Sequence, residues 1–167
     1  MGDVMQVTID EVTDFTIFQI ACWPDTLGKM GSEAAMMTGV DAAPLPGQSA
    51  TGEHGALLRI EPLKWWLVCA SNAQLPDIDG ELGAVLDLTA SRIRLRVAGP
   101  RAADLLNRFL PINLSDQAFP DGAVGSTGFH HVGVTLWRQG NAFDLFLPRS
   151  FAASLIELLE ASAEQFR

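Results

Sequence analysis

The sequence has few positive charges, few cysteines and no long apolar run. Its 167 residues include 11 Lys+Arg, of which only Lys29 and Lys64 are lysines, against 20 Asp+Glu, for a formal net charge of −9. A nucleic-acid-binding surface needs Lys and Arg to neutralise phosphates, and anionic membranes attract basic segments, so we expect neither as a partner. No apolar stretch reaches the ~18 residues typical of a membrane-spanning helix.

Cysteine usage and the first residues bear on the compartment. Cys22 and Cys69 lie in separate apolar runs, outside any CxxC pair, which predicts buried thiols and no disulfide framework. The N-terminus is acidic at Asp3, where a secretory signal is basic, and Gln6 stands where a myristoylation motif has Ser or Thr. These features predict a cytoplasmic protein.

Charged residues are scarce and unevenly placed. They make up 19% of the chain, below the usual ~25%, which indicates that another protein covers part of the surface. Residues 1–83 hold twelve acids and three bases, whereas residues 84–167 hold eight of each. The difference predicts one acidic and one balanced face, or simply acids scattered over a solvated surface.

The apolar pattern predicts strands interleaved with three helices. Strands are expected at 4–9, 14–22, 56–61, 63–70, 84–89, 92–98, 129–138 and 141–148. Helices are expected from Pro24 to Gly39, from Pro100 to Pro111, and after Ser150 as N-cap. Residues 41–55 read as a mobile loop, and 74–83 as weakly helical at best.

The two halves of the chain, 1–83 and 84–167, share one order of elements at an offset of about 75 residues. No residue-level repeat accompanies it, so chance recurrence of common elements competes with a true pseudo-repeat. We expect an α+β fold with mixed or antiparallel sheets, in which residues 1–167 form a single domain built from two similar subdomains.

The usual catalytic motifs are missing from the sequence. His130 and His131 are adjacent on a predicted strand and so point to opposite faces, which disfavours a shared metal. We find no G-x-S-x-G nucleophile motif, P-loop or G-x-G-x-x-G. The sequence therefore predicts no catalytic, cofactor-binding or metal-binding residue in this chain.

Arginines and tryptophans instead indicate contact surfaces. Arg92, Arg94 and Arg96 alternate with aliphatic residues, which places three guanidinium groups on one strand face. Like charges at this spacing need an answering carboxylate, either within the chain or on a partner. Trp66 and Trp137 lie opposite the main apolar faces of their strands. Because Trp and Arg are enriched at interfaces, these five residues are the interface candidates.

Several segments resemble a known family. The stretches Val85-Leu86-Asp87-Leu88-Thr89, Arg96-Val97-Ala98-Gly99-Pro100 and Asp104-Leu105-Leu106 are similar to motifs of the glycine-cleavage T-protein superfamily. Trp65-Trp66-Leu67-Val68, Leu136-Trp137-Arg138, Phe143-Asp144-Leu145-Phe146 and 148–155 resemble the gamma subunit of heterotetrameric sarcosine oxidase.

The resemblance implies a T-protein-like folate-binding-domain fold of two β-β-α-β-β-β-α halves. It also implies a complex that oxidatively demethylates sarcosine to glycine and whose other subunits hold FAD, FMN, NAD, zinc and tetrahydrofolate, with no cofactor in this chain. The larger flavoprotein subunits would be the partners. The T-protein pattern has a catalytic aspartate in a hairpin, and the matching region here, 128–134, contains no acid.

We therefore expect a non-catalytic accessory subunit of a sarcosine oxidase. Charge reversal by Arg94→Glu and Arg96→Glu is expected to weaken assembly without unfolding the chain. A stand-alone folate-binding or one-carbon-transfer module is the alternative. A structural homo-oligomer is a third possibility.

Overall fold

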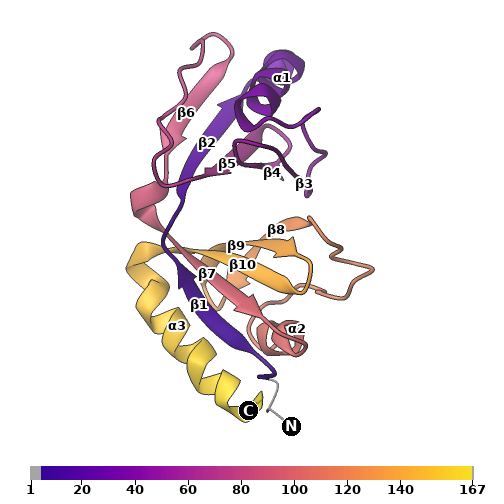
Figure 1. Cartoon of the computed structure of the whole chain (residues 1–167), viewed down its shortest axis with the longest axis vertical. Helices are drawn as coiled ribbons and strands as arrows, with labels where there is room; N and C mark the ends of the chain where they lie inside the picture. Colours follow the sequence, from indigo (N-terminus) through magenta and orange to yellow (C-terminus); the bar gives the residue numbers. More distant parts are fainter. Residues whose placement is uncertain (1–4, 167) are drawn as a thin grey trace. The chain divides into compact units, whose positions relative to one another are not determined.

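The computed structural model describes residues 5–166 and contains two five-stranded sheets in which every pairing is antiparallel (Figure 1). The expected α+β class is confirmed. The chain divides into two compact units. Unit 2 is the continuous segment Thr13–Ala90, and unit 1 combines the residues up to Val12 with those from Ser91 onward.

Unit 2 is a sheet with the strand order β3-β4-β5-β2-β6. Its elements are β2 (Thr16–Cys22), η1 (Pro24–Thr26), α1 (Leu27–Thr38), β3 (Ser49–Thr51), β4 (Ala56–Glu61), β5 (Lys64–Cys69) and β6 (Gly83–Asp87), and η2 (Thr89–Ser91) leads onward. Met30 and Ala34 of α1 pack into one buried cluster with Trp65 and Leu67 of β5. The helix ends at Gly39, which adopts φ 75° and donates its N–H to the Ala35 and Met36 carbonyls.

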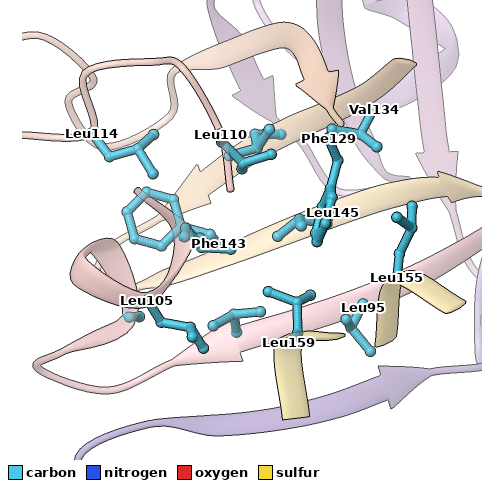
Figure 2. Close-up of a cluster of buried hydrophobic side chains, with 14 of the residues drawn as sticks. Leu95, Leu105, Leu110, Leu114, Phe129, Val134, Phe143, Leu145, Leu155 and Leu159 are labelled. Carbon is cyan, nitrogen blue, oxygen red and sulfur yellow. The ribbon is translucent and has the colours of Figure 1, made fainter. Parts of the chain in front are cut away.

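Unit 1 is a sheet with the strand order β1-β7-β10-β9-β8. Its elements are β1 (Thr8–Val12), β7 (Arg92–Ala98), α2 (Ala102–Leu106), β8 (Val124–Phe129), β9 (Val132–Gln139), β10 (Ala142–Pro148), α3 (Arg149–Ala163) and η3 (Glu164–Phe166). Leu155 and Leu159 of α3 pack with Leu95 of β7 and Leu145 of β10, as Figure 2 shows. One face of this sheet therefore forms the unit's core.

The two sheets repeat one topology. In each unit a strand leads into a helix and then a three-stranded meander, whose last strand pairs with the first: β2 with β5, and β7 with β10. The fifth strand differs in origin, because β1 pairs with β7 and β6 pairs with β2. Each half of the sequence thus contributes its first strand to the other half's sheet. The boundaries of the two units, at 12/13 and 90/91, therefore differ from the single boundary expected at 83/84.

Several predicted elements differ from the structure. The first strand is Thr8–Val12, not 4–9, and residue 4 lies outside the described part of the chain. The expected loop 41–55 contains β3. The expected strand 129–138 covers the last residue of β8, a two-residue turn and most of β9, so the rest of β8 was not predicted. Residues 74–83, expected to be weakly helical at best, form no helix. Glycine, serine and threonine in β3 and β8 weaken the apolar alternation that marks a strand.

The second and third helices also differ in extent. α2 ends at Leu106, well before Pro111, and α3 has Pro148 rather than Ser150 as its N-cap. Phe151 and Leu158 of α3 are exposed, whereas Leu155 and Leu159 of the same helix are buried. No helix within residues 5–166 has the length and apolar character needed to cross a membrane.

Candidate docking surface and the arginine face

The alternation along β7 separates charge from core as predicted. Leu95 and Val97 are buried in the unit 1 cluster, and Arg92, Arg94 and Arg96 occupy the alternate positions. The register places Arg96 directly opposite Asp144 of β10, with Arg94 opposite Phe146. The answering carboxylate therefore lies within the chain, which is one of the two alternatives that the sequence left open.

Asp144 is fully buried and is held by two arginines and one amide. Arg94 donates from Nε at 2.8 Å and from Nη2 at 2.5 Å to Oδ2. Arg96 donates from Nε to Oδ1 at 2.7 Å and from Nη2 to Oδ2 at 2.9 Å. Gln139 Nε2 adds a fifth contact, to Oδ2 at 2.6 Å. Four of the five contacts end on Oδ2 and one on Oδ1, so the cluster engages both carboxylate oxygens away from solvent.

Aromatic rings hold the inner arginine in place. The Arg94 guanidinium carbon lies 5.5 Å from the Trp137 ring centroid and 5.8 Å from that of Phe146. Both rings are buried, and Arg94 itself is 9% exposed. Cation–π contact and the pairing with Asp144 together stabilise a buried charge that would otherwise be costly.

The other two arginines of the face have different environments. The hydrogen bond to Asp144 raises the pKa of Arg96 above its ordinary value, against the opposing effect of burial. Burial lowers the pKa of Arg92, which donates to the Ser91 carbonyl and hydroxyl oxygens. The Arg96 side chain is 38% exposed, so it is both a partner of Asp144 and accessible.

The two candidate tryptophans are buried. Trp66 is 4% exposed and donates from Nε1 to Gln19 Oε1 at 3.1 Å, and Trp137 is 5% exposed. Neither is an exposed side chain, and their docking role stays a prediction. Trp23, which precedes η1, is 62% exposed. Pro24 follows Trp23 and begins η1, so the strand ends before the Trp23 ring. This proline was the signal in the sequence that Trp23 lies outside β2.

The buried arginine changes one expectation. Arg94→Glu and Arg96→Glu were expected to weaken assembly without unfolding the chain. Either change would now set a second carboxylate beside buried Asp144 and remove a donor pair. We expect both substitutions to destabilise unit 1, because like charges repel strongly where water is excluded.

His130 and His131 form the two-residue turn that joins β8 to β9, rather than part of a strand. His130 adopts φ 54°, and its ring packs edge-on to Phe109 with centroids 6.2 Å apart. His131 is exposed. Within residues 5–166, no group of three His, Cys, Asp or Glu side chains is placed to hold a metal ion.

Comparison with known proteins places the chain in a family. No family model matches it. A sarcosine oxidase subunit gamma from Corynebacterium sp. (strain U-96) is 32% identical over 166 residues, which cover 95% of this chain and 80% of the relative. The chain belongs to the sarcosine oxidase gamma subunit family. A gamma subunit from Arthrobacter sp. is 29% identical over 87% of this chain and 73% of its own length.

Solved structures agree with the family assignment. A chain of the heterotetrameric sarcosine oxidase from Corynebacterium sp. U-96, in complex with pyrrole 2-carboxylate, matches with a TM-score of 0.80 and 27% identity over 98% of this chain and 87% of that one. The glycine cleavage aminomethyltransferase T from Bartonella henselae matches with a TM-score of 0.67 and 21% identity over 92% of this chain and 45% of that one. The gamma subunit family and the T-protein thus share one fold, as the sequence resemblance implied.

Proposed function

We propose that this chain is an accessory subunit of a heterotetrameric sarcosine oxidase, which oxidatively demethylates sarcosine to glycine. The match to a chain of that complex carries the proposal, because it extends over nearly the whole sequence. In this proposal the flavins, NAD, zinc and tetrahydrofolate belong to the other subunits, the larger flavoprotein subunits are the partners, and the complex is cytoplasmic.

The chemistry of the chain supports an accessory role. The buried carboxylate of unit 1, Asp144, accepts hydrogen bonds from five donor atoms and has no exposed surface. By the sequence resemblance, residues 128–134 correspond to the T-protein's catalytic hairpin; here they contain no acid, and His130 and His131 lie at the turn. These residues favour a subunit that contributes surface to the complex.

Co-expression tests this proposal. The chain, carrying an affinity tag, is produced with the larger flavoprotein subunits of the same organism's sarcosine oxidase. We expect a stoichiometric complex that oxidises sarcosine, whereas the purified chain alone shows no turnover. Failure of the subunits to co-purify would refute the proposal.

The T-protein fold favours one second candidate, a stand-alone folate-binding module. Isothermal titration of the isolated chain with tetrahydrofolate distinguishes the two. The accessory role predicts no heat of binding, and saturable binding by the isolated chain would favour the folate module. Light scattering on the same sample tests the third possibility, a self-assembled homo-oligomer.

A further inference from the structure

Unit 2 contains a cavity of about 410 Å³ between α1 and the segment that follows it. Gly28, Ser32 and Met36 line one side at successive turns of the helix. Ala42 and Ala43 line the other side, and Trp65 of β5 also lines the cavity. The volume lies within the range of pockets that bind ligands or protein side chains.

The helix side is built for close approach. A Cβ atom added to Gly28 would meet no heavy atom within 4 Å, so open space lies directly over the helix backbone there. Two turns further on, the Met36 side chain is 73% exposed. Small residues beside an exposed methionine allow another backbone to approach α1 and cover an apolar surface.

The Trp65 side of the cavity carries the cationic side chain of Arg59, which has no carboxylate partner among the described residues. Trp65 is 0% exposed, and within residues 5–166 its Nε1 is buried without a hydrogen-bond partner. The Arg59 guanidinium carbon lies 5.5 Å from the Trp65 ring centroid and also lines the cavity. Arg59 donates to the Pro44 and Pro62 carbonyls, and in the described part of the chain it forms no ion pair.

These features define what would complete the cavity. Arg59 is partly exposed and lines the cavity, so an occupant that brings an oxygen acceptor to the guanidinium is favoured over a purely apolar one. A negative charge on that occupant would complement the arginine. Asp41 also lines the cavity, but its side chain is exposed, so it does not occupy a buried position beside Arg59.

We propose that this cavity receives an apolar segment of a larger partner subunit that carries an acidic residue, with the carboxylate directed toward Arg59. The inference rests on the proposed function, since it names where the partner docks. A protein segment fits better than a small molecule because a further apolar side chain, Leu45, lies two residues after the lining residue Ala43 and is 65% exposed.

Substitution of Gly28 tests the inference in the co-expressed complex. Gly28→Phe fills the open space over α1, and we expect it to weaken association with the larger subunits at least tenfold. Gly28→Ala is the matched control: it adds a methyl group where nothing lies within 4 Å and improves helix propensity. We expect this control to associate within twofold of the wild type and to melt at the same or a higher temperature.

Oxidative footprinting gives a readout that needs no substitution. Met36 and Met5 are 73% and 59% exposed, so hydrogen peroxide should oxidise both in the isolated chain. We expect Met36 to be oxidised at least fivefold more slowly in the complex than in the isolated chain. The rate of Met5 oxidation in the isolated chain shows that the oxidant is active. Unchanged oxidation of Met36 in the complex would overturn the inference.

The outcomes separate this inference from the proposed function. If the wild type does not assemble, the proposed function fails. If the wild type and Gly28→Phe assemble equally well, the function stands and the docking cavity is wrong. Titration with 3-phenylpropionate, an apolar carboxylate, tests whether the cavity is instead a small-molecule site. Saturable binding that Gly28→Phe abolishes, together with unchanged assembly, would make this a small-molecule site and overturn the docking inference.

Discussion

A single buried carboxylate organises the charged face of unit 1. Asp144 is 0% exposed and faces two guanidinium groups, so the cluster carries a net positive charge. Removing charges from water is expensive, and such clusters are stable only when hydrogen bonds satisfy most of their donors and acceptors. The four guanidinium contacts and the Gln139 amide meet that condition.

Asp144→Asn is expected to destabilise the chain by about 3–5 kcal/mol, because it leaves Arg94 and Arg96 without a counter-charge. Urea unfolding followed by circular dichroism measures the change. Asp104→Asn is the matched control: Asp104 pairs with Arg101, and their side chains are 55% and 49% exposed. That exposed pair should contribute at most about 1 kcal/mol. Equal losses in the two variants would contradict the role of burial.

The two thiols should be slow to react in the folded chain. Burial raises the pKa of Cys69 above the ordinary 9.0, and burial raises that of Cys22 against a smaller opposing effect of Arg59. Less thiolate is therefore present at pH 8 than for a free cysteine. We expect iodoacetamide to label both residues much faster in urea than in buffer, as measured by mass spectrometry.

The same shifts fix a sign for stability against pH. Because the folded pKa values are raised, the unfolded chain loses its thiol protons first. The thiol contribution to stability is therefore complete below about pH 8 and falls as the pH rises past 9. Rapid labelling of the folded chain at pH 8 would contradict both statements.

The sequence predicted the arginine face but not its partner. Period-two spacing placed Arg94 and Arg96 on one face from local geometry alone. Asp144 lies far along the chain, and no local pattern pairs β7 with β10. One signal was present: Asp144 is a lone acid in the apolar run Phe143–Leu147, and a charge in such a strand is rarely buried without a partner.

At the scale of elements, strong apolar patterns were read correctly and weak ones were not. β4 and β7 have the predicted bounds because their apolar and β-branched residues are typical of strands. β8 contains Gly125, Ser126 and Gly128, which carry little apolar signal. Its position depends on pairing with β9, which is a tertiary effect that the local sequence does not encode.

Gly99 lies directly after β7, in the three-residue connection to α2. Gly99 adopts φ 116°, and a Cβ atom there would lie 2.5 Å from the Gln6 carbonyl oxygen. That carbonyl accepts the Arg101 N–H at 3.0 Å, so the close approach ties the segment before β1 to the start of α2. Neither the φ angle nor the space allows a side chain at this position.

Gly99→Ala should therefore cost more than about 2 kcal/mol, from backbone strain and the collision together. Gly140→Ala is the control, because Gly140 also has positive φ, 60°, but an added Cβ meets nothing within 4 Å. We expect the control to cost about 1 kcal/mol. Thermal unfolding of the two variants compares them, and a Gly140 effect as large as the Gly99 effect would show that φ alone sets the cost.

At the scale of the whole molecule, the sequence revealed the repeat but not the exchange of strands. β1 begins at Thr8 and β6 at Gly83, about 75 residues apart, which matches the expected offset. Each of these strands pairs with the sheet of the other half. The element order is the same with or without this exchange, so the order alone could not distinguish the two arrangements.

The exchange makes unit 1 depend on the N-terminal strand. A chain that begins at Thr13 lacks β1, which pairs with β7 from Thr8 to Val12, and lacks Val7 and Ile9 from the unit 1 core. Losing two apolar side chains and a strand edge should cost unit 1 about 3–6 kcal/mol. We expect hydrogen exchange, measured by mass spectrometry, to accelerate in β7 and α3.

The strands of unit 2 provide the internal control for this truncation, because β2 and β5 make no pairing with β1. Hydrogen exchange in β2 and β5 should be the same in the truncated and the full chain. A synthetic peptide of residues 5–12, added in excess, should restore protection from hydrogen exchange to β7. Equal acceleration in both units would mean that they unfold as one cooperative block. If hydrogen exchange in β7 is unchanged by the truncation, β1 contributes little to the stability of the sheet. The pairing of β1 with β7 would then not be what couples the N-terminus to unit 1.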